Sequence, residues 1–218
     1  MLCRWYALER VAVRPVVLHD AGMPTHVAFL RGVNNLGSKP VSMGELRAIV
    51  ASLGHTDVMT YIQSGNILFS SRPLTGRGPT GADTAALAAE LERAIAASIG
   101  VQARAVVLSR GELARCYRDN PYPGEQDPKR LHAVFLPEAP GPAMTDWLAG
   151  AERQARTNGS RDEVTVLDRT VYLHTPDGFP QSELRRALAR AGGPTSAAVA
   201  GTARNWATVT RLVELCES

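Results

Sequence analysis

The hydrophobic residues recur along the chain with two periods, one typical of β-strands and one typical of α-helices. An apolar run at residues 25–31 has the composition of a strand. Apolar side chains then follow at i, i+3, i+4 and i+7, namely Leu46, Ile49, Val50 and Leu53. That spacing places them on one face and predicts an amphipathic helix over 43–53. The same periods predict strands at 58–63, 66–70 and 101–108, and helices over 83–98 and from 109 to before Asn120.

Capping and turn residues mark the ends of these elements. Two predicted helices begin with a capping box, in which a serine and a glutamate three residues later satisfy free backbone amides. The pairs are Ser42 with Glu45 and Ser109 with Glu112. Asp83 is the predicted N-cap of the helix between them. Ser64-Gly65 separates two β-rich runs and predicts a hairpin with a tight turn.

The second half of the chain repeats the order of the first. It predicts strands at 131–136, 163–167, 170–174 and 197–203, and helices over 142–151, 182–191 and 205–216. The pentapeptides at 26–30 and 132–136 are nearly identical. We therefore predict an α+β protein of two tandem ferredoxin-like (βαββαβ) subdomains, 23–125 and 126–218, with antiparallel sheets and helices on one face. Residues 1–22 fit neither repeat and are predicted to be an extension, with Met23 as the true start.

Charge is almost balanced along the chain. Of the 24 basic residues only Lys39 and Lys129 are lysines, and the net charge is +3. Residues 23–128 carry 10 basic and 9 acidic side chains, and residues 129–218 carry 11 and 10. This even distribution disfavours nucleic-acid binding, which favours a basic surface. No apolar run is long enough to span a membrane and no secretory signal is evident, so we expect a cytoplasmic protein.

Cysteine and histidine give little sign of a metal or redox site. Cys3, Cys116 and Cys216 are too widely spaced for a disulfide framework, and the last two are expected to be buried structural thiols. The five histidines are scattered and form no ligand pair of helical spacing. We therefore expect no metal.

Two further motifs carry no chemistry. Gly76-x-Gly78-x-x-Gly81 matches the dinucleotide fingerprint in its letters, but it lies in a Gly/Pro-rich loop and does not open a helix directly from a strand. We interpret it as a linker and expect no cofactor. Asp162-Glu163 precedes a predicted strand, and we interpret the pair as solvated.

The first candidate site is the long segment that joins the first strand to the first helix. It contains Arg31, Gly32, Asn34 and Lys39, just before a predicted helix N-terminus. Guanidinium, ammonium and amide groups at this position favour an anion pocket. The alternative is a surface loop in which Asn and Gly only form turns.

Two other segments could complete that pocket. Gln63, Ser64 and Asn66 could present polar groups to a ligand, or could simply form the hairpin turn. Near the C-terminus, Asn205 is expected to cap the last helix, and Arg204 is either a solvated charge or a partner of Arg31 around one anion.

Several motifs occur in an order that resembles one protein family. They are Arg31-Gly-Val-Asn34, Met43-x-Glu45-Leu-Arg47, Thr60-Tyr-Ile-Gln-Ser-Gly-Asn66, Asn120-Pro-Tyr122, Tyr172-Leu173, Pro176-Asp-Gly178 and Thr202-Ala-Arg-Asn-Trp-Ala-Thr-Val209. This order resembles the domain-of-unknown-function 1697 family of bacterial proteins, over nearly the whole chain from Met23. The resemblance implies two ferredoxin-like subdomains and no activity. Leu36 and Glu183 depart from the family pattern, which often has glycine and lysine there.

Three functions are compatible with these patterns. The first is a small polar or anionic ligand-binding protein, in which an enzymatic reaction is left open and no catalytic residue is identified. The second is a single-stranded nucleic-acid-binding protein that uses open sheet faces, on which Phe29 and Phe69 could stack on bases. The alternative for these two side chains, which we prefer, is packing in the core. The third is an interaction module, in which the apolar hairpins pair edge to edge into a homodimer.

Overall fold

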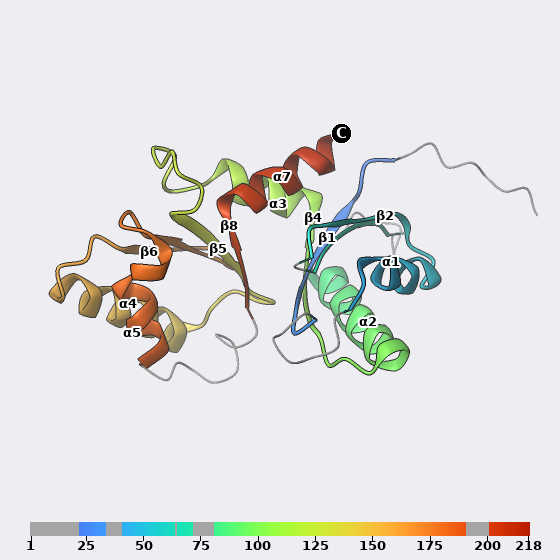
Figure 1. The fold of residues 1–218 in the computed structure, drawn as a ribbon, viewed down its shortest axis with the longest axis horizontal. Helices are drawn as coiled ribbons and strands as arrows, with labels where there is room; N and C mark the ends of the chain where they lie inside the picture. The colour runs from blue at the N-terminus through green and yellow to red at the C-terminus, as the bar shows by residue number, and fades with distance from the viewer. Residues whose placement is uncertain (1–21, 34–40, 64, 72–80, 191–200) are drawn as a thin grey trace, which may run out of the picture.

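The computed structural model describes residues 22–33, 41–63, 65–71, 81–190 and 201–218, which form two four-stranded antiparallel sheets covered by helices (Figure 1). The first half contains β1 (His26–Arg31), α1 (Met43–Ser52), β2 (Thr56–Tyr61), β3 (Asn66–Ser70), α2 (Gly81–Ile99), β4 (Arg104–Ser109) and α3 (Arg110–Arg118). The second contains β5 (Leu131–Phe135), α4 (Pro142–Thr157), β6 (Glu163–Leu167), β7 (Thr170–His174), a short 3-10 turn (Phe179–Gln181), α5 (Glu183–Arg190), β8 (Thr202–Asn205) and α7 (Trp206–Glu217). The mixed α+β class predicted from the sequence is confirmed.

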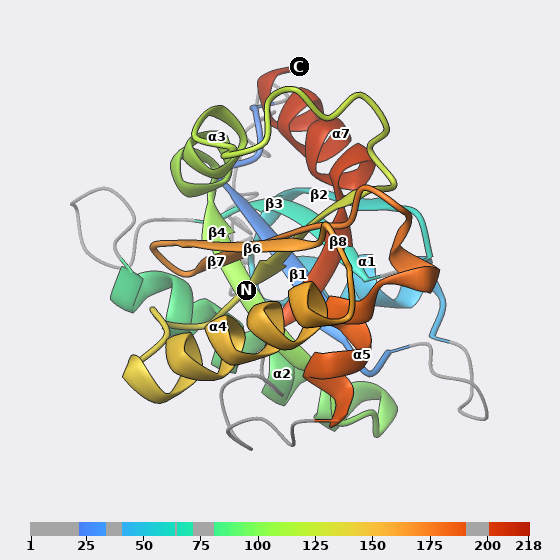
Figure 2. The same cartoon turned by 90° about the vertical axis from the view of Figure 1, so that its left-hand side faces the viewer.

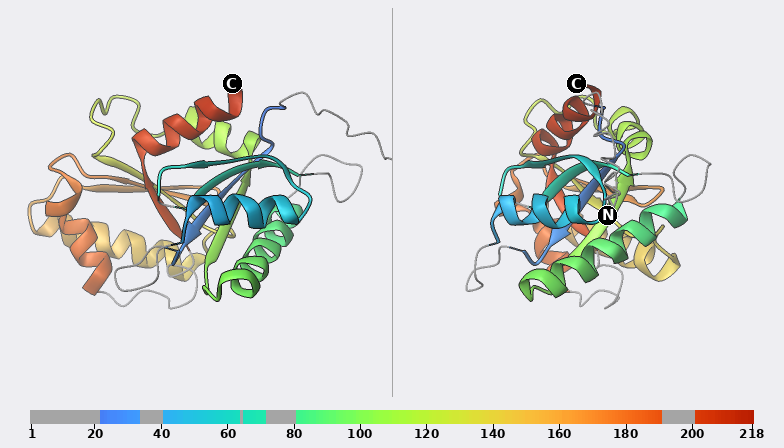
Figure 3. Two further views of the ribbon diagram at one scale, coloured as in Figure 1. Left: turned by 45° about the vertical axis from the view of Figure 1, so that its right-hand side comes forward. Right: turned by 90° about the vertical axis from the view of Figure 1, so that its right-hand side faces the viewer.

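The first sheet has the strand order β2-β3-β1-β4, and all neighbouring strands are antiparallel. Helices α1 and α2 lie on one face of it (Figure 3). The predicted face of α1 is buried there, with Leu46, Ile49 and Val50 packed against Ala28 and Ile67 of the sheet. Burial of such apolar side chains is the main force that fixes the helices to this face.

The second sheet repeats this arrangement. Its order is β6-β7-β5-β8, again antiparallel throughout. Helices α4 and α5 lie below this sheet in Figure 2 and cover one of its faces. Leu148 and Ala151 of α4 and Leu184 of α5 pack there against Val171 and Leu173 of β7.

The remaining faces of the two sheets pack against each other. Phe29 of β1 and Phe135 of β5 stack with ring centroids 4.3 Å apart. Helices α3 and α7 lie side by side over this shared core, to which Leu113 and Leu212 contribute (Figure 1). Because Phe29 and Phe69 are both fully buried, neither stacks on a base in this structure, and the hypothesis of open, base-binding sheet faces loses its support.

Local signals place several boundaries correctly. Both predicted capping boxes are present, at Ser42 and at Ser109, and Asn205 accepts a hydrogen bond from Thr208 N as the N-cap of α7. Strands β3, β6 and β7 have the predicted bounds. In contrast, β2 covers residues 56–61 instead of 58–63, because a bulge with φ of +52° at Asp57 shifts its register and φ of +50° at Ile62 ends it.

Four other elements differ from the prediction by two or more residues at one end, and the rest by at most a single residue at either end. Helix α2 begins at Gly81, so Asp83 lies within its first turn, and β4 covers residues 104–109 instead of 101–108. Helix α4 continues to residue 157 instead of 151, because Ala155 extends the buried face of Ala151 by one turn. Strand β8 covers residues 202–205 and so continues two residues beyond the predicted end at 203, while residues 197–200 of the predicted strand lie outside those described.

Asp162 is not solvated, so that prediction is wrong for this residue. Its carboxylate is buried and accepts hydrogen bonds from Ser182 Oγ at 2.8 Å and from Leu184 N at 3.0 Å. It therefore caps the start of α5 from another segment, a contact that adjacent residues do not predict. The side chain of Glu163 is half exposed, as expected.

Several other predictions concern residues outside those described. They are the extension up to residue 21, the candidate residues Asn34, Lys39 and Ser64, and Gly76 and Gly78 of the glycine motif. Within the described parts of the chain, no helix has the length and apolar character needed to cross a membrane.

Candidate functional site

Arg204 links the two halves of the chain. From β8 its Nε donates to Asn66 Oδ1 at 2.5 Å and its Nη2 donates to Leu30 O at 3.1 Å. The guanidinium carbon also lies 5.6 Å from the ring centroid of Phe29. Burial lowers the pKa of Arg204 to about 10, so the side chain stays charged at neutral pH. We call this group, with Arg31 and Gly201, the inter-sheet seam.

The hairpin geometry presents Asn66 to Arg204. Asn66 is fully buried, and its Nδ2 donates to Tyr61 O across the turn at 3.1 Å. The preceding Gly65 has φ of +71°, and a Cβ there would lie only 2.9 Å from Leu30 Cβ. Glycine at this position thus lets the turn approach β1 closely. The Gly65-Asn66 pair therefore has a structural role in the inter-sheet seam.

The other predicted residues lie around this seam. Arg31 is exposed at the end of β1, and its Nη1 lies 3.5 Å from Gly201 O. Gly32 adopts φ of +88°, and Gln63 is exposed on the hairpin. The structure thus brings Arg31, Asn66 and Arg204 together from three segments, and Arg204 is a partly buried residue of β8 instead of a solvated charge.

A cleft of about 280 Å³ lies between α3 and the β6–β7 hairpin. Its lining combines charged, hydroxyl and apolar side chains: Leu108, Glu112, Arg115, Cys116, Asp119, Ala139, Leu167, Asp168, Arg169, Thr170 and Tyr172. None of these was a predicted site residue. The residues of the helical wall follow Glu112 at the spacing i+3, i+4 and i+7, so they lie on one face of α3 and its C-cap. The hairpin that faces them is distant in sequence.

One wall of the cleft is an ion pair that also connects the two halves of the chain. Arg169 Nη2 donates to Glu112 Oε1 at 2.7 Å and to Val107 O at 2.9 Å, and Nη1 lies 3.3 Å from Pro137 O. Burial alone would raise the pKa of Glu112, but the Ser109 amide and the Arg169 guanidinium outweigh it and hold that pKa below its ordinary value. Glu112 therefore remains ionised.

Another part of the lining holds a tyrosine and a thiol in contact. Tyr172 Oη lies 2.8 Å from Cys116 O and 3.2 Å from Cys116 Sγ. Burial raises the pKa of both groups, so thiol and phenol are protonated at neutral pH. Cys116 and Cys216 are free and buried, in line with structural thiols. Since the nucleophilic form of cysteine is the thiolate, Cys116 is poorly suited to covalent chemistry here.

The mouth of the cleft carries charges that are only loosely paired. Arg115 Nη1 and Asp168 Oδ2 are 3.9 Å apart, and their side chains are 58% and 78% exposed. Ion pairs this open to water are worth little. The two side chains can therefore separate and bind a ligand instead, at a small cost in free energy.

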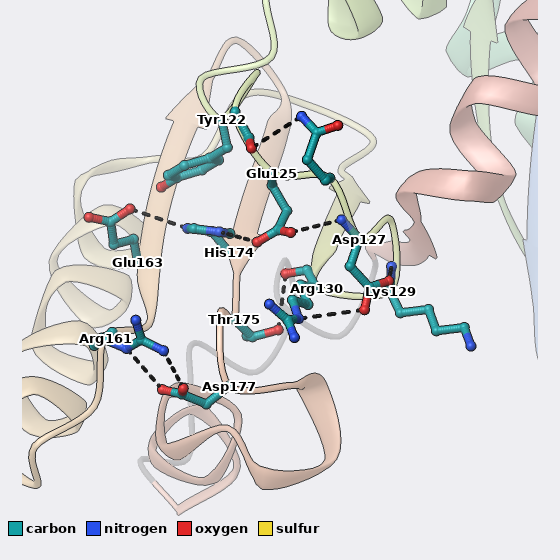
Figure 4. Close-up of polar contacts among 12 residues, drawn as sticks. Tyr122, Glu125, Asp127, Lys129, Arg130, Arg161, Glu163, His174, Thr175 and Asp177 are labelled. Carbon is teal, nitrogen blue, oxygen red and sulfur yellow. Dashed lines mark hydrogen bonds and ion pairs between the residues drawn. The ribbon is translucent and has the colours of Figure 1, made fainter.

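His174 forms a separate polar cluster (Figure 4). Its Nε2 lies 3.0 Å from Glu125 Oε2 and its Nδ1 lies 3.4 Å from Glu163 Oε2. The ring stacks on Tyr122 with centroids 4.6 Å apart, and the Tyr122 hydroxyl is 2.8 Å from Thr165 Oγ1. Since both ring nitrogens face carboxylates, the cluster attaches the segment between α3 and β5 to the second sheet. It is no metal site, because no three metal-binding side chains are grouped suitably within the described residues.

Comparison with known proteins supports the fold. A solved structure, described as that of the conserved bacterial protein SP0830 from Streptococcus pneumoniae, superposes with a TM-score of 0.62 at 20% sequence identity. The match covers 88% of this chain and 98% of that one. At this identity the likeness concerns the fold alone. No curated protein matches the chain.

The sequence match to a family is more direct. A family model described as "Protein of unknown function (DUF1697)" matches residues 23–172. This range is more than half of the chain and contains the Arg31 segment and the hairpin turn that carried the resemblance. The chain therefore belongs to the DUF1697 family of proteins of unknown function.

Proposed function

We propose that the protein binds a small polar ligand in the cleft between α3 and the β6–β7 hairpin. The observation that carries the proposal is a cleft of about 280 Å³ that combines apolar walls with the loosely paired charges of Arg115 and Asp168. Ligand sites are typically concave and largely apolar, with a few polar groups that fix orientation. A volume near the lower end of the usual range of roughly 300–1,000 Å³ favours a small molecule.

The proposal is for binding, and an enzymatic reaction stays open. Among the described residues of the cleft, Cys116 and Tyr172 would be the nucleophile and the acid, and burial raises the pKa of both. Glu112 is ionised but is already bonded to Arg169 and Ser109. These groups support recognition better than they support proton transfer or covalent catalysis.

A thermal-shift screen of polar metabolites, nucleotides and sugar phosphates tests the proposal. A ligand at 100 times its dissociation constant adds about 2.7 kcal/mol of stability. Ala139→Trp fills the cleft from an exposed position and is expected to abolish the shift. Ala89→Trp, on the exposed face of α2 and outside the cleft, is the matched control. A ligand that binds the Ala139→Trp variant normally would show that this cleft is not the site.

The inter-sheet seam is a second candidate, for an anion. The observation in its favour is that two guanidinium groups meet there: Arg31 Nη1 lies 3.5 Å from Gly201 O, and Arg204 Nη2 donates to Leu30 O at 3.1 Å. Arg31→Ala distinguishes the two candidate sites, because it would weaken the binding of an anion at the seam and leave binding in the cleft unchanged. Equal affinity of an anionic hit for this variant and the wild type excludes the seam.

We further propose that the halves are tandem ferredoxin-like subdomains, 23–125 and 126–218. Both have the element order βαββαβ followed by a helix, and both have equivalent strand orders. Their registers make Phe29 equivalent to Phe135, which pair with Asn66 and Thr170. Two residues before each phenylalanine, Val27 pairs with Leu108 and Ala133 pairs with Arg204. Superposition of the two halves in a solved structure must bring these pairs together, or the proposal is wrong.

Location and assembly also remain proposals. The bacterial source of the similar structure and the free, buried Cys116 and Cys216 favour a bacterial cytoplasm. A homodimer would use the outer strands β2 or β6, where Met59 and Leu167 are exposed. Light scattering coupled to size-exclusion chromatography tests it, and a monomeric mass excludes it.

A further inference from the structure

We propose that the ligand of the cleft is a zwitterion: a small molecule with a carboxylate, an ammonium group and an apolar side chain, in the manner of an α-amino acid. This inference rests on the proposed function and narrows the class of ligand. Some charged groups of the cleft are held by close hydrogen bonds within the protein, whereas others are paired only loosely and can bind a ligand.

The ion pair in the wall is committed. The guanidinium of Arg169 contacts Glu112, two backbone carbonyls of the second half and Val107 O of the first. Glu112 uses its other oxygen, Oε2, to accept from Ser109 N at 2.8 Å and from Ser109 Oγ at 2.9 Å. A ligand that recruited either side chain would have to break contacts that join the halves of the chain. We therefore assign this pair to the architecture of the cleft.

The charges that remain are one cation and two anions. Arg115 lies on α3, Asp119 is the C-cap residue that follows this helix, and Asp168 lies opposite at the hairpin tip. Asp119 also pairs with the exposed Arg118 at 3.1 Å. A ligand with only an anionic group would compete with Asp168 for Arg115 and would leave that carboxylate without a cation. A zwitterion can give its carboxylate to Arg115 and its ammonium group to Asp168, replacing a 3.9 Å contact with two closer ones.

The apolar lining gives the ligand its third feature. Leu108 and Tyr172 are buried in the shared core, and Ala139 and Leu167 are exposed at the cleft. A ligand side chain placed against Leu167 would remove apolar surface from water on both partners. The combination of one cation, two carboxylates and an apolar wall within about 280 Å³ matches an amino acid better than a nucleotide or a sugar phosphate.

Isothermal titration calorimetry of the full chain tests the zwitterion proposal with three amino acids and with two analogues of the one that binds most tightly. L-leucine, L-methionine and L-phenylalanine are titrated first. The amide of the tightest binder lacks the carboxylate, and its deaminated acid lacks the ammonium group. We expect at least one amino acid to bind, and each analogue to bind at least tenfold more weakly, because each leaves one charged group of the cleft without its partner.

Two substitutions locate the two ends of the ligand. Arg115→Ala is expected to reduce amino-acid affinity at least tenfold, whereas Arg93→Ala, at an exposed position of α2 outside the cleft, is expected to leave it unchanged. Asp168→Asn removes the second charge and keeps the backbone, because asparagine tolerates the φ of +51° found there. It is also expected to reduce the affinity at least tenfold.

The outcomes separate the two proposals. If an analogue without its ammonium or carboxylate group binds as tightly as the amino acid, the zwitterion proposal is wrong. It is also wrong if no amino acid binds while another compound binds and is blocked by Ala139→Trp, and in that case the cleft remains a ligand site. If every ligand found binds the Ala139→Trp variant normally, both proposals fail.

Discussion

Replacing Arg169 by methionine tests how the halves of the chain are joined. Methionine keeps most of the aliphatic length and removes the guanidinium. The variant loses the hydrogen bonds to Glu112 and Val107 at 2.7 and 2.9 Å and the longer contact with Pro137. It also leaves the carboxylate of Glu112 without its cation, so the loss includes the cost of an unpaired charge.

The magnitude follows from how far the pair is removed from water. The side chains of Arg169 and Glu112 are 16% and 28% exposed, between a buried pair and a surface pair. Breaking a fully buried pair costs about 3–5 kcal/mol, and hydrogen bonds to charged groups contribute about 1.5–3 kcal/mol. Since Ser109 still donates to Glu112, we expect a loss of about 3 kcal/mol in the free energy of unfolding. For a chain of this length that lowers the melting temperature by roughly 6–12 °C.

Urea unfolding followed by circular dichroism at pH 7 measures this loss. Arg115→Met is the matched control, because its ion pair with Asp168 spans 3.9 Å between exposed groups and is worth less than about 1 kcal/mol. If Arg169→Met is no more destabilising than this control, the ion pair does not join the halves and the reasoning is refuted.

The same variant has a signature in its pH dependence. The pKa of Glu112 in the folded protein lies below its ordinary value, so the unfolded state takes up the proton first as the pH falls. The stability that Glu112 contributes is therefore present above the unfolded pKa of about 4.5 and is lost as the pH falls through the folded value. Removing the Arg169 guanidinium should reduce this acid dependence, and an unchanged slope would contradict the assigned cause.

Three further predictions concern single contacts. Asp162→Ala should lose about 2 kcal/mol of unfolding free energy, because its two buried hydrogen-bond donors lose their acceptor, whereas the exposed Glu138→Ala should change it by less than about 0.5 kcal/mol in the same urea assay. Ile62→Asn should raise the melting temperature, with a gain of about 0.5–1 kcal/mol, because a half-exposed β-branched residue is strained at φ of +50° and asparagine is not. Burial lowers the pKa of His26 and of His55 below the unfolded value of 6.5. The stability that these neutral rings contribute is therefore present above pH 6.5 and should be lost as the pH falls below it. His26→Phe should make the melting temperature measured by calorimetry depend less on pH in this range.

The parts of the fold that the sequence predicts are those governed by short-range contacts. Ser42 and Ser109 form their capping boxes with residues three positions ahead, and Asn205 caps α7 in the same local way. The β6–β7 hairpin is bounded by its own two-residue turn. For such elements the interacting groups are adjacent in sequence, so periodicity and turn chemistry suffice.

The features that were missed depend on contacts between distant segments. Asp162 is buried because α5, more than twenty residues later, offers it an amide. Glu112 and Arg169 meet although 57 positions separate them, and neither neighbourhood has a motif that marks the cleft. The signal that could have been used is the mixed charged and apolar face of α3, from Glu112 to Asp119, which a helix covering a core does not need.

The two halves carry different residues at positions that are equivalent in the register of their sheets. Leu108 and Arg204 occupy the same place in the register of their sheets, as do Thr170 and Asn66. Leu108 and Thr170 line the cleft, whereas Arg204 extends into the first half and bonds to Asn66. A leucine at one position and a long charged arginine at the other thus give the two positions different surroundings, although both sheets have the same kind of strand order. Arg204 therefore joins the halves at one position, whereas Leu108 at the equivalent position lines the cleft in which we propose that a ligand binds.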